Sequence, residues 1–102
     1  MSNDSVVYIN GAWQVQSQAK IPFMDGGFLF GDGIFETTPF INRKMFRPSK
    51  HLERFHRGLS VLKMQLNKSD DELIDILQKT IDKNQLESGL IRLMITRGTI
   101  SG

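Results

Sequence analysis

One face of a predicted helix carries a histidine, an arginine and a glycine. His51, Arg54 and Gly58 stand at positions i, i+3 and i+7, which is the spacing of side chains on a shared helical face. Glycine inside a helix costs about 1 kcal/mol relative to alanine, so Gly58 indicates close approach by another group. A phosphate would suit the planar fork of Arg54. The local pattern favours a plainer interpretation, a surface arginine beside a glycine on which a strand packs.

Three further positions could carry chemistry. Glu36 lies inside a predicted strand, where a carboxylate needs a partner, and we expect a structural pairing with an arginine. Arg92 lies in the last predicted strand and faces either solvent or a ligand carboxylate, two alternatives that the pattern leaves open. The Gly31-Asp32-Gly33 turn could resemble a phosphate-binding loop, but no helix follows it, so a turn entering a strand is expected.

Composition excludes several classes of protein. The chain has 102 residues, no cysteine and two histidines, so a disulfide framework, a thiolate metal site and a histidine metal site are not expected. No apolar run is long enough for a membrane span and no signal peptide is visible, which fits a cytoplasmic protein. The net charge is only +2. One basic cluster stands out, formed by Arg43, Lys44, Arg47, Lys50, Arg54 and Arg57.

The N-terminal third predicts strands around a glycine-rich segment. Residues 6–9 and 12–15 flank Asn10-Gly11, the strongest two-residue hairpin signal. Residues 24–33 combine glycines with large apolar side chains, which suggests a loop that is buried or lines a pocket. Residues 34–41 and 45–46 then predict two more strands.

The remainder predicts two helices and a final strand. One helix opens at Pro48-Ser49, with apolar residues at helical spacing up to Leu62, and a second follows the Ser69 to Glu72 capping box. Gly89 is expected to end the second helix, before a strand over residues 90–96. The order indicates an α+β domain in which two helices pack on a largely antiparallel sheet.

Taken together, three segments resemble the N-terminal small domain of class IV (fold type IV) aminotransferases, which depend on pyridoxal 5′-phosphate (PLP). Tyr8-Ile9-Asn10-Gly11 is similar to the opening hairpin of that family, and residues 27–36 are similar to its glycine loop and following strand. Residues 46–55 match its His-x-x-Arg helix start through His51 and Arg54. Residues 90–98 resemble the next strand and its Arg-Gly ending. The family includes branched-chain and D-amino acid aminotransferases, R-selective amine transaminases and aminodeoxychorismate lyases.

The resemblance implies roles for individual residues. Arg54 is expected to bind the PLP phosphate, while Phe30, Phe35 and Arg92 are expected to line the substrate pocket of a homodimer. The resemblance also implies that residues 1–102 are the N-terminal domain only. The lysine that binds PLP covalently is then expected beyond Gly102, in a catalytic domain that this chain lacks. The expected reaction moves an amino group between a branched-chain or otherwise apolar amino acid and a 2-oxo acid.

The sequence departs from the family at two positions, and alternatives stay open. D-amino acid aminotransferases have a tyrosine at the position of Phe35, so the missing hydroxyl argues against that specificity. Gly26 replaces a basic residue that is common in the family. An aminodeoxychorismate lyase is the alternative within the family. The basic surface and the short chain leave an alternative from another class, a non-catalytic or nucleic-acid-binding α+β domain, although neither nucleic acid nor a membrane is the expected partner.

Overall fold

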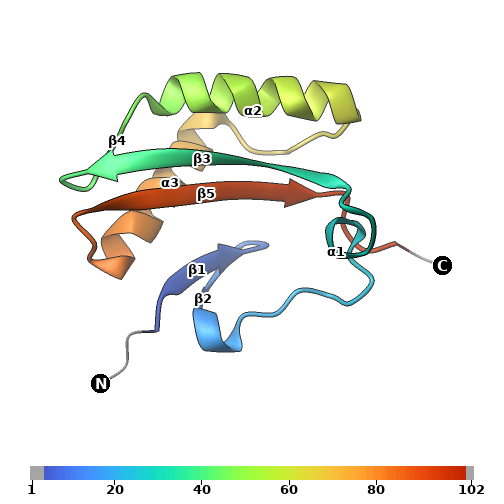
Figure 1. The fold of residues 1–102 in the computed structure, drawn as a ribbon, viewed down its shortest axis with the longest axis horizontal. Helices are drawn as coiled ribbons and strands as arrows, with labels where there is room; N and C mark the ends of the chain where they lie inside the picture. Colours follow the sequence, from blue (N-terminus) through green and yellow to red (C-terminus); the bar gives the residue numbers. More distant parts are fainter. Residues whose placement is uncertain (1–3, 101–102) are drawn as a thin grey trace.

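The computed structural model describes residues 4–100 and has an α+β architecture, as the sequence predicted. The described part of the chain forms two antiparallel sheets, two long helices and one short helix (Figure 1). In order, the elements are β1 (Val6–Ile9), β2 (Ala12–Val15), a 3₁₀ turn (Gln16–Gln18), α1 (Gly26–Phe30), β3 (Gly33–Ile41), β4 (Lys44–Met45), α2 (Pro48–Leu62), α3 (Asp70–Asn84) and β5 (Ser88–Thr96).

The larger sheet has the strand order β4-β3-β5, and all its pairings are antiparallel. β3 pairs with β5 along its full length, from Gly33 opposite Thr96 to Ile41 opposite Ser88. β4 pairs only with Phe40 and Ile41. The first part of β3 therefore has no strand on its second edge within residues 4–100, and α2 runs beside β3 (Figure 1).

The core lies between the larger sheet and the two long helices. Because side chains alternate across a strand, every second residue of β3 points toward α2, which packs on this strand, while α3 packs on β5. Among residues 4–100, the buried apolar residues are Phe40, Leu52, Phe55, Leu59, Leu73, Leu77 and Ile81. They include most of the helical stripes that the sequence indicated, whereas Leu62 is only partly buried.

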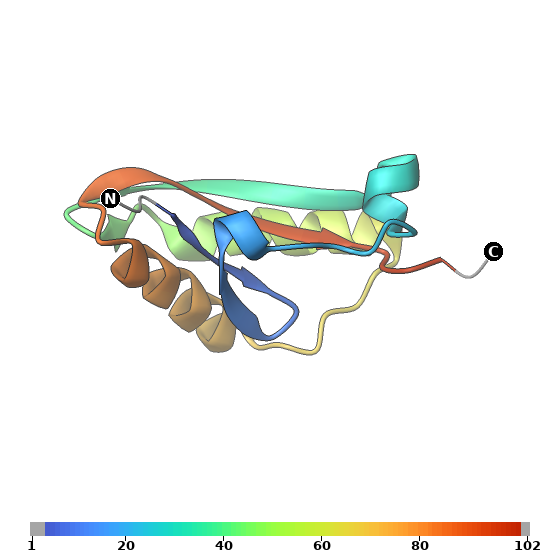
Figure 2. The ribbon, with the colours of Figure 1, turned by 90° about the horizontal axis from the view of Figure 1, so that it is seen from below.

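The N-terminal hairpin forms a separate two-stranded sheet that packs on α3 (Figure 2). Its turn is the predicted Asn10-Gly11, with φ of 48° and 94°. The Asn84 side chain ties the hairpin to the end of α3, because its Nδ2 donates to the Val6 carbonyl at 2.9 Å and its Oδ1 accepts from the Val6 amide at 2.8 Å. Trp13 also donates to the Thr80 hydroxyl, at 3.4 Å.

The starts of both long helices agree with the sequence, but one predicted end is wrong. Pro48 opens α2, and the Ser69–Glu72 capping box opens α3 with both reciprocal hydrogen bonds present. α3 ends at Asn84 because Gln85 adopts a left-handed conformation, so Gly89 does not stop it. Gly89 lies in β5 instead, where a Cβ would stand 3.1 Å from the Phe40 ring. A side chain here would press on that ring, so the glycine favours the close contact with Phe40 across the sheet.

The glycine-rich segment also differs from the expectation, because it contains the short helix α1. The carboxylate of Asp25 accepts from the amides of Gly27 and Phe28 at 2.9 and 3.3 Å, which caps the helix, and Gly31 ends it with φ of 65°. The predicted turn into β3 is confirmed. The aromatic side chains of the segment are not buried, since Phe28 and Phe30 are 64% and 72% exposed.

Candidate functional site

Glu36, His51 and Arg54 form a cluster between β3 and α2, called here the Glu36 cluster. The Glu36 side chain is 7% exposed. Arg54 donates from Nε to Oε1 at 3.1 Å and from Nη2 to Oε2 at 2.7 Å. His51 Nδ1 lies 2.7 Å from Oε2, and it is the donor because an ionised carboxylate only accepts hydrogen bonds. The expected pairing of Glu36 with an arginine is confirmed.

The electrostatics of the cluster stabilise both charged groups. The hydrogen bond from Arg54 lowers the pKa of Glu36, and the bond from His51 lowers it further, against burial, which raises it. The same hydrogen bond to Glu36 raises the pKa of the Arg54 guanidinium. Burying an unpaired carboxylate would be costly. The hydrogen bonds from Arg54 and His51 therefore keep Glu36 ionised on the side of β3 that faces α2.

Arg54 is held in place and still reaches solvent. Its side chain is 66% exposed, and it uses two of the five N–H groups of a guanidinium on Glu36, which leaves three. A shallow cleft surrounds it, lined by Lys50, His51, Glu53, Arg54 and Arg57. A fixed guanidinium with outward N–H groups, beside further cations, has the chemistry of a phosphate site.

Gly58 serves the packing of the strand. A Cβ at this position would lie 3.0 Å from Cδ1 of Ile34 in β3. The glycine therefore lets α2 approach the strand closely, which was the plainer of the two interpretations. His51, Arg54 and Gly58 do share one helix face, but only the first two are polar groups that a ligand could contact.

Arg92 and Phe35 lie together on the opposite, open face of the sheet. The Arg92 guanidinium carbon stands 4.5 Å from the centre of the Phe35 ring, a cation–π contact, and Nε donates to the Thr37 hydroxyl at 3.4 Å. Phe35 is 57% exposed. Leu90 and Met94 extend the same exposed apolar surface along β5. The Arg92 side chain therefore lies on the exposed face, against the Phe35 ring, and its contact with a ligand carboxylate stays a prediction.

Phe30 stands apart from that pair, on α1. Its ring is exposed. The start of the segment that carries it pairs with the chain just after β5, through a bridge between Asp25 and Thr99. Thr96 donates to one oxygen of Asp25 at 2.8 Å, and the Gly26 amide donates to the Gly98 carbonyl at 2.8 Å. The sequence analysis did not predict these hydrogen bonds. The available signal was Asp25 followed by two glycines, which is typical of a capped helix start.

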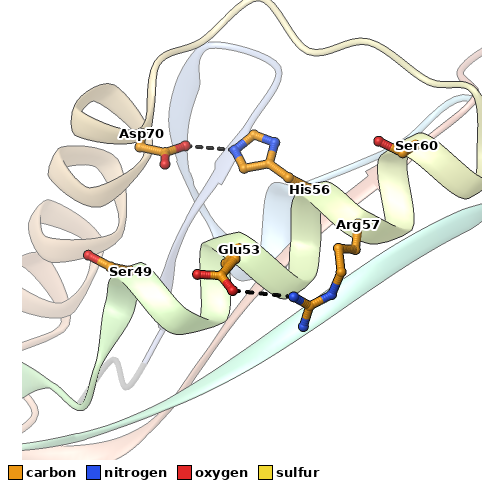
Figure 3. Close-up of a pocket in the computed structure, with 6 residues that line it drawn as sticks. All are labelled: Ser49, Glu53, His56, Arg57, Ser60 and Asp70. Atoms are coloured by element: carbon orange, nitrogen blue, oxygen red, sulfur yellow. Dashed lines mark hydrogen bonds and ion pairs between the residues drawn. The ribbon is translucent and has the colours of Figure 1, made fainter.

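A second surface depression lies between α2 and α3 and contains none of Phe30, Phe35, Arg54 and Arg92 (Figure 3). Its ionisable side chains are paired with each other: His56 with Asp70 at 2.6 Å and Arg57 with Glu53 at 3.3 Å. Within residues 4–100 no group of three or more potential ligands could hold a metal ion. No helix in the described part of the chain is long and apolar enough to cross a membrane.

Comparison with known proteins decides the family. The sequence model described as "Amino-transferase class IV" matches residues 33–101. The chain belongs to the class IV aminotransferase family. It is 40% identical over 92 residues to a D-alanine aminotransferase of Staphylococcus aureus (strain MSSA476), a match that covers 90% of this chain and 33% of the relative. A putative branched-chain-amino-acid aminotransferase of Methanocaldococcus jannaschii is 32% identical, with coverage of 90% and 32%.

Solved structures of the family share this fold. The branched-chain aminotransferase of Escherichia coli superposes with a TM-score of 0.88 at 25% identity, covering 96% of this chain and 34% of that one. A putative 4-amino-4-deoxychorismate lyase from Legionella pneumophila superposes with a TM-score of 0.78 at 26% identity, covering 85% and 32%. The chain therefore spans about a third of the length of its class IV relatives.

Proposed function

We propose that this chain is the N-terminal part of a PLP-dependent aminotransferase. The observation that carries the proposal is the Glu36 cluster, which fixes an exposed arginine in a basic cleft at a position suited to a phosphate. When bound, PLP supplies the electron sink that amino-group transfer needs. A branched-chain aminotransferase that shares this fold was solved as a complex with N-(5′-phosphopyridoxyl)-L-glutamate, a compound that contains the phosphopyridoxyl group.

Different residues of this chain would bind the cofactor and the substrate. Arg54 would hold the cofactor phosphate with charge-assisted hydrogen bonds, oriented by Glu36. Phe35 and Arg92 would line the substrate pocket, with Phe35 offering an apolar wall and Arg92 a charge for a carboxylate. Arg54 and Phe35 flank the same stretch of β3, from its helix side and its open face, beside the edge that β4 leaves uncovered. Phe30, exposed on α1, would reach the site of the partner subunit in a cytoplasmic homodimer.

The lysine that binds PLP covalently would lie in a second domain. The full-length protein, meaning the chain continued to the length of its relatives, is then active, and residues 1–102 alone are inactive. The test is to incubate each with PLP, an amino acid and 2-oxoglutarate. Transamination by the full-length protein and none by residues 1–102 is expected. Turnover by residues 1–102, or none by the full-length protein under any donor, would overturn the proposal.

The amino donor is expected to be apolar. Phe35, Leu90 and Met94 present apolar surface where the substrate side chain would lie. Each buried methylene contributes about 0.8 kcal/mol, so kcat/KM for L-leucine should exceed that for L-alanine at least about fourfold. The panel must include D-alanine, the substrate named by the Staphylococcus relatives. Equal values for leucine and alanine, or a preference for D-alanine, would contradict this donor assignment.

Lyase activity on aminodeoxychorismate is the second candidate, because the Legionella structure shares the fold. It predicts release of pyruvate and 4-aminobenzoate without an amino acceptor. A non-catalytic, nucleic-acid-binding role for the basic cluster is the third. It predicts RNA retention in a filter-binding assay and no visible absorbance band from bound PLP in the full-length protein.

A further inference from the structure

Residues 23–31, called here the aromatic arm, are attached to the rest of the domain at both ends. The arm carries three exposed rings, with Phe23, Phe28 and Phe30 at 73%, 64% and 72% exposure. At its start, the Met24 carbonyl accepts from the Ile100 amide at 2.9 Å, beside the Asp25–Thr96 hydrogen bond. These bonds hold the arm to the end of β5 only.

The second attachment combines backbone hydrogen bonds at the start of β3 with the side chain of Arg97. Its Nε donates to Oδ2 of Asp32 at 2.9 Å and its Nη2 donates to Oδ1 at 3.2 Å, so the fork grips the carboxylate with two bonds. The Arg97 amide also donates to the Asp32 carbonyl at 3.0 Å. Asp32 directly follows the arm, and the hydrogen bond from Arg97 lowers the pKa of its carboxyl.

The same guanidinium reaches the end of α2. Nη2 of Arg97 donates to the Leu62 carbonyl at 2.9 Å. Leu62 is the last residue of α2, where the helix carbonyls lack partners inside the helix and a cation is favoured by the dipole. Arg97 therefore joins three segments: the turn after the arm, the end of β5 and the end of α2.

We propose that Arg97 is a positioning residue that fixes the aromatic arm relative to α2. Arg54 lies eight residues before Leu62 in α2, about two helical turns away. Through Asp32 and Leu62, Arg97 thus sets the distance between the helix that carries Arg54 and the arm that carries Phe28 and Phe30. Because Phe30 would reach the site of the partner subunit, loosening of the arm would weaken the selection of leucine over alanine there. This consequence rests on the proposed function, whereas the fixation of the arm does not.

Limited chymotrypsin digestion of the full-length protein tests the fixation directly. Cleavage after Phe30 reports opening of the arm, and cleavage after Phe46, which is 58% exposed, is the internal reference. Arg97→Met should raise the ratio of Phe30 to Phe46 cleavage at least about threefold. This is the size of effect expected when one exposed ion pair is lost. Arg97→Lys should restore part of the effect, because it returns the charge without the fork.

Arg43→Met is the matched control. Arg43 also bonds a carboxylate through Nε, that of Glu87 at 2.7 Å, and its side chain has the same 41% exposure as that of Arg97. It lies in the turn between β3 and β4, away from the arm. An unchanged cleavage ratio in Arg97→Met, or an equal rise in Arg43→Met, would overturn the assignment, because the arm would then be held without Arg97.

A second measurement separates positioning from general stability. In Arg97→Met the ratio of kcat/KM for leucine over alanine should fall at least about threefold, while PLP retention stays at the parent value because Arg54 is untouched. An unchanged ratio would overturn the role in selection. If the parent transaminates no donor, the proposed function is wrong, and the cleavage comparison, which needs no cofactor, still decides the role of Arg97.

Discussion

Replacing Arg54 by alanine should weaken retention of PLP by the full-length protein at least about tenfold. A charge-assisted hydrogen bond contributes about 1.5–3 kcal/mol, and about 1.4 kcal/mol is a factor of ten. Arg54 has three N–H groups beyond those that bond Glu36, and its side chain is 66% exposed. Dialysis against cofactor-free buffer, followed by the visible absorbance of the remaining PLP, measures the loss.

Two further variants sharpen that result. Arg54→Lys should recover part of the affinity, since it restores the charge but not the fork. Arg57→Ala is the comparison within the same cleft. Arg57 lies about one turn further along α2 and pairs with Glu53 at 3.3 Å, so its loss should weaken PLP retention less than the loss of Arg54. If Arg54→Ala retains PLP as the parent does, or if Arg57→Ala loses more, the phosphate assignment is wrong.

Glu36→Gln should lower the free energy of unfolding of the 102-residue chain by about 1–3 kcal/mol at pH 7. The substitution keeps the shape of the side chain but removes the charge that holds Arg54 and His51. The expected loss of stability is smaller than that from breaking a fully buried ion pair, because the exposed Arg54 guanidinium can hydrogen-bond to water instead. Urea unfolding followed by the fluorescence of Trp13 measures it. Glu53→Gln, which removes only an exposed pair, should have little effect.

The effect of Glu36→Gln should also depend on pH. The pKa of Glu36 is lowered in the folded chain, so the carboxylate contributes its full stability above the ordinary pKa of 4.5. That contribution is lost as the pH falls below this value toward the lowered pKa of the folded state. The parent and Glu36→Gln should therefore converge in acid. A difference that stays constant from neutral pH down to about one unit below the ordinary pKa would show that the charge of Glu36 does not stabilise the fold.

Local signals in the sequence predicted the elements that depend on neighbouring residues. Asn10-Gly11 determines the hairpin turn, and the Ser69–Glu72 capping box determines where α3 starts. Apolar residues at helical spacing up to Leu62 predicted the face of α2 that packs on β3. In each case the responsible groups lie within a few residues of each other, so the pattern can be recognised without the fold.

The errors and omissions arose where distant residues decide the conformation. Gly89 is typical of a helix end, but its role is set by the Phe40 ring across the sheet. Glu36 was expected to pair with an arginine, yet only the fold shows that Arg54 is that arginine and that His51 shares the carboxylate. The bonds of Arg97 to Asp32 and Leu62 span 65 and 35 residues, and no local pattern indicates them.

The most direct test of the phosphate assignment compares PLP with pyridoxal, which lacks the phosphate. The ratio of the two affinities, measured by absorbance titration of the full-length protein freed of cofactor, isolates what the phosphate contributes to binding. Arg54→Ala should lower this ratio at least about tenfold and leave the affinity for pyridoxal unchanged. An unchanged ratio in Arg54→Ala would mean that the Glu36 cluster does not bind the cofactor phosphate, and would contradict the role proposed for this domain.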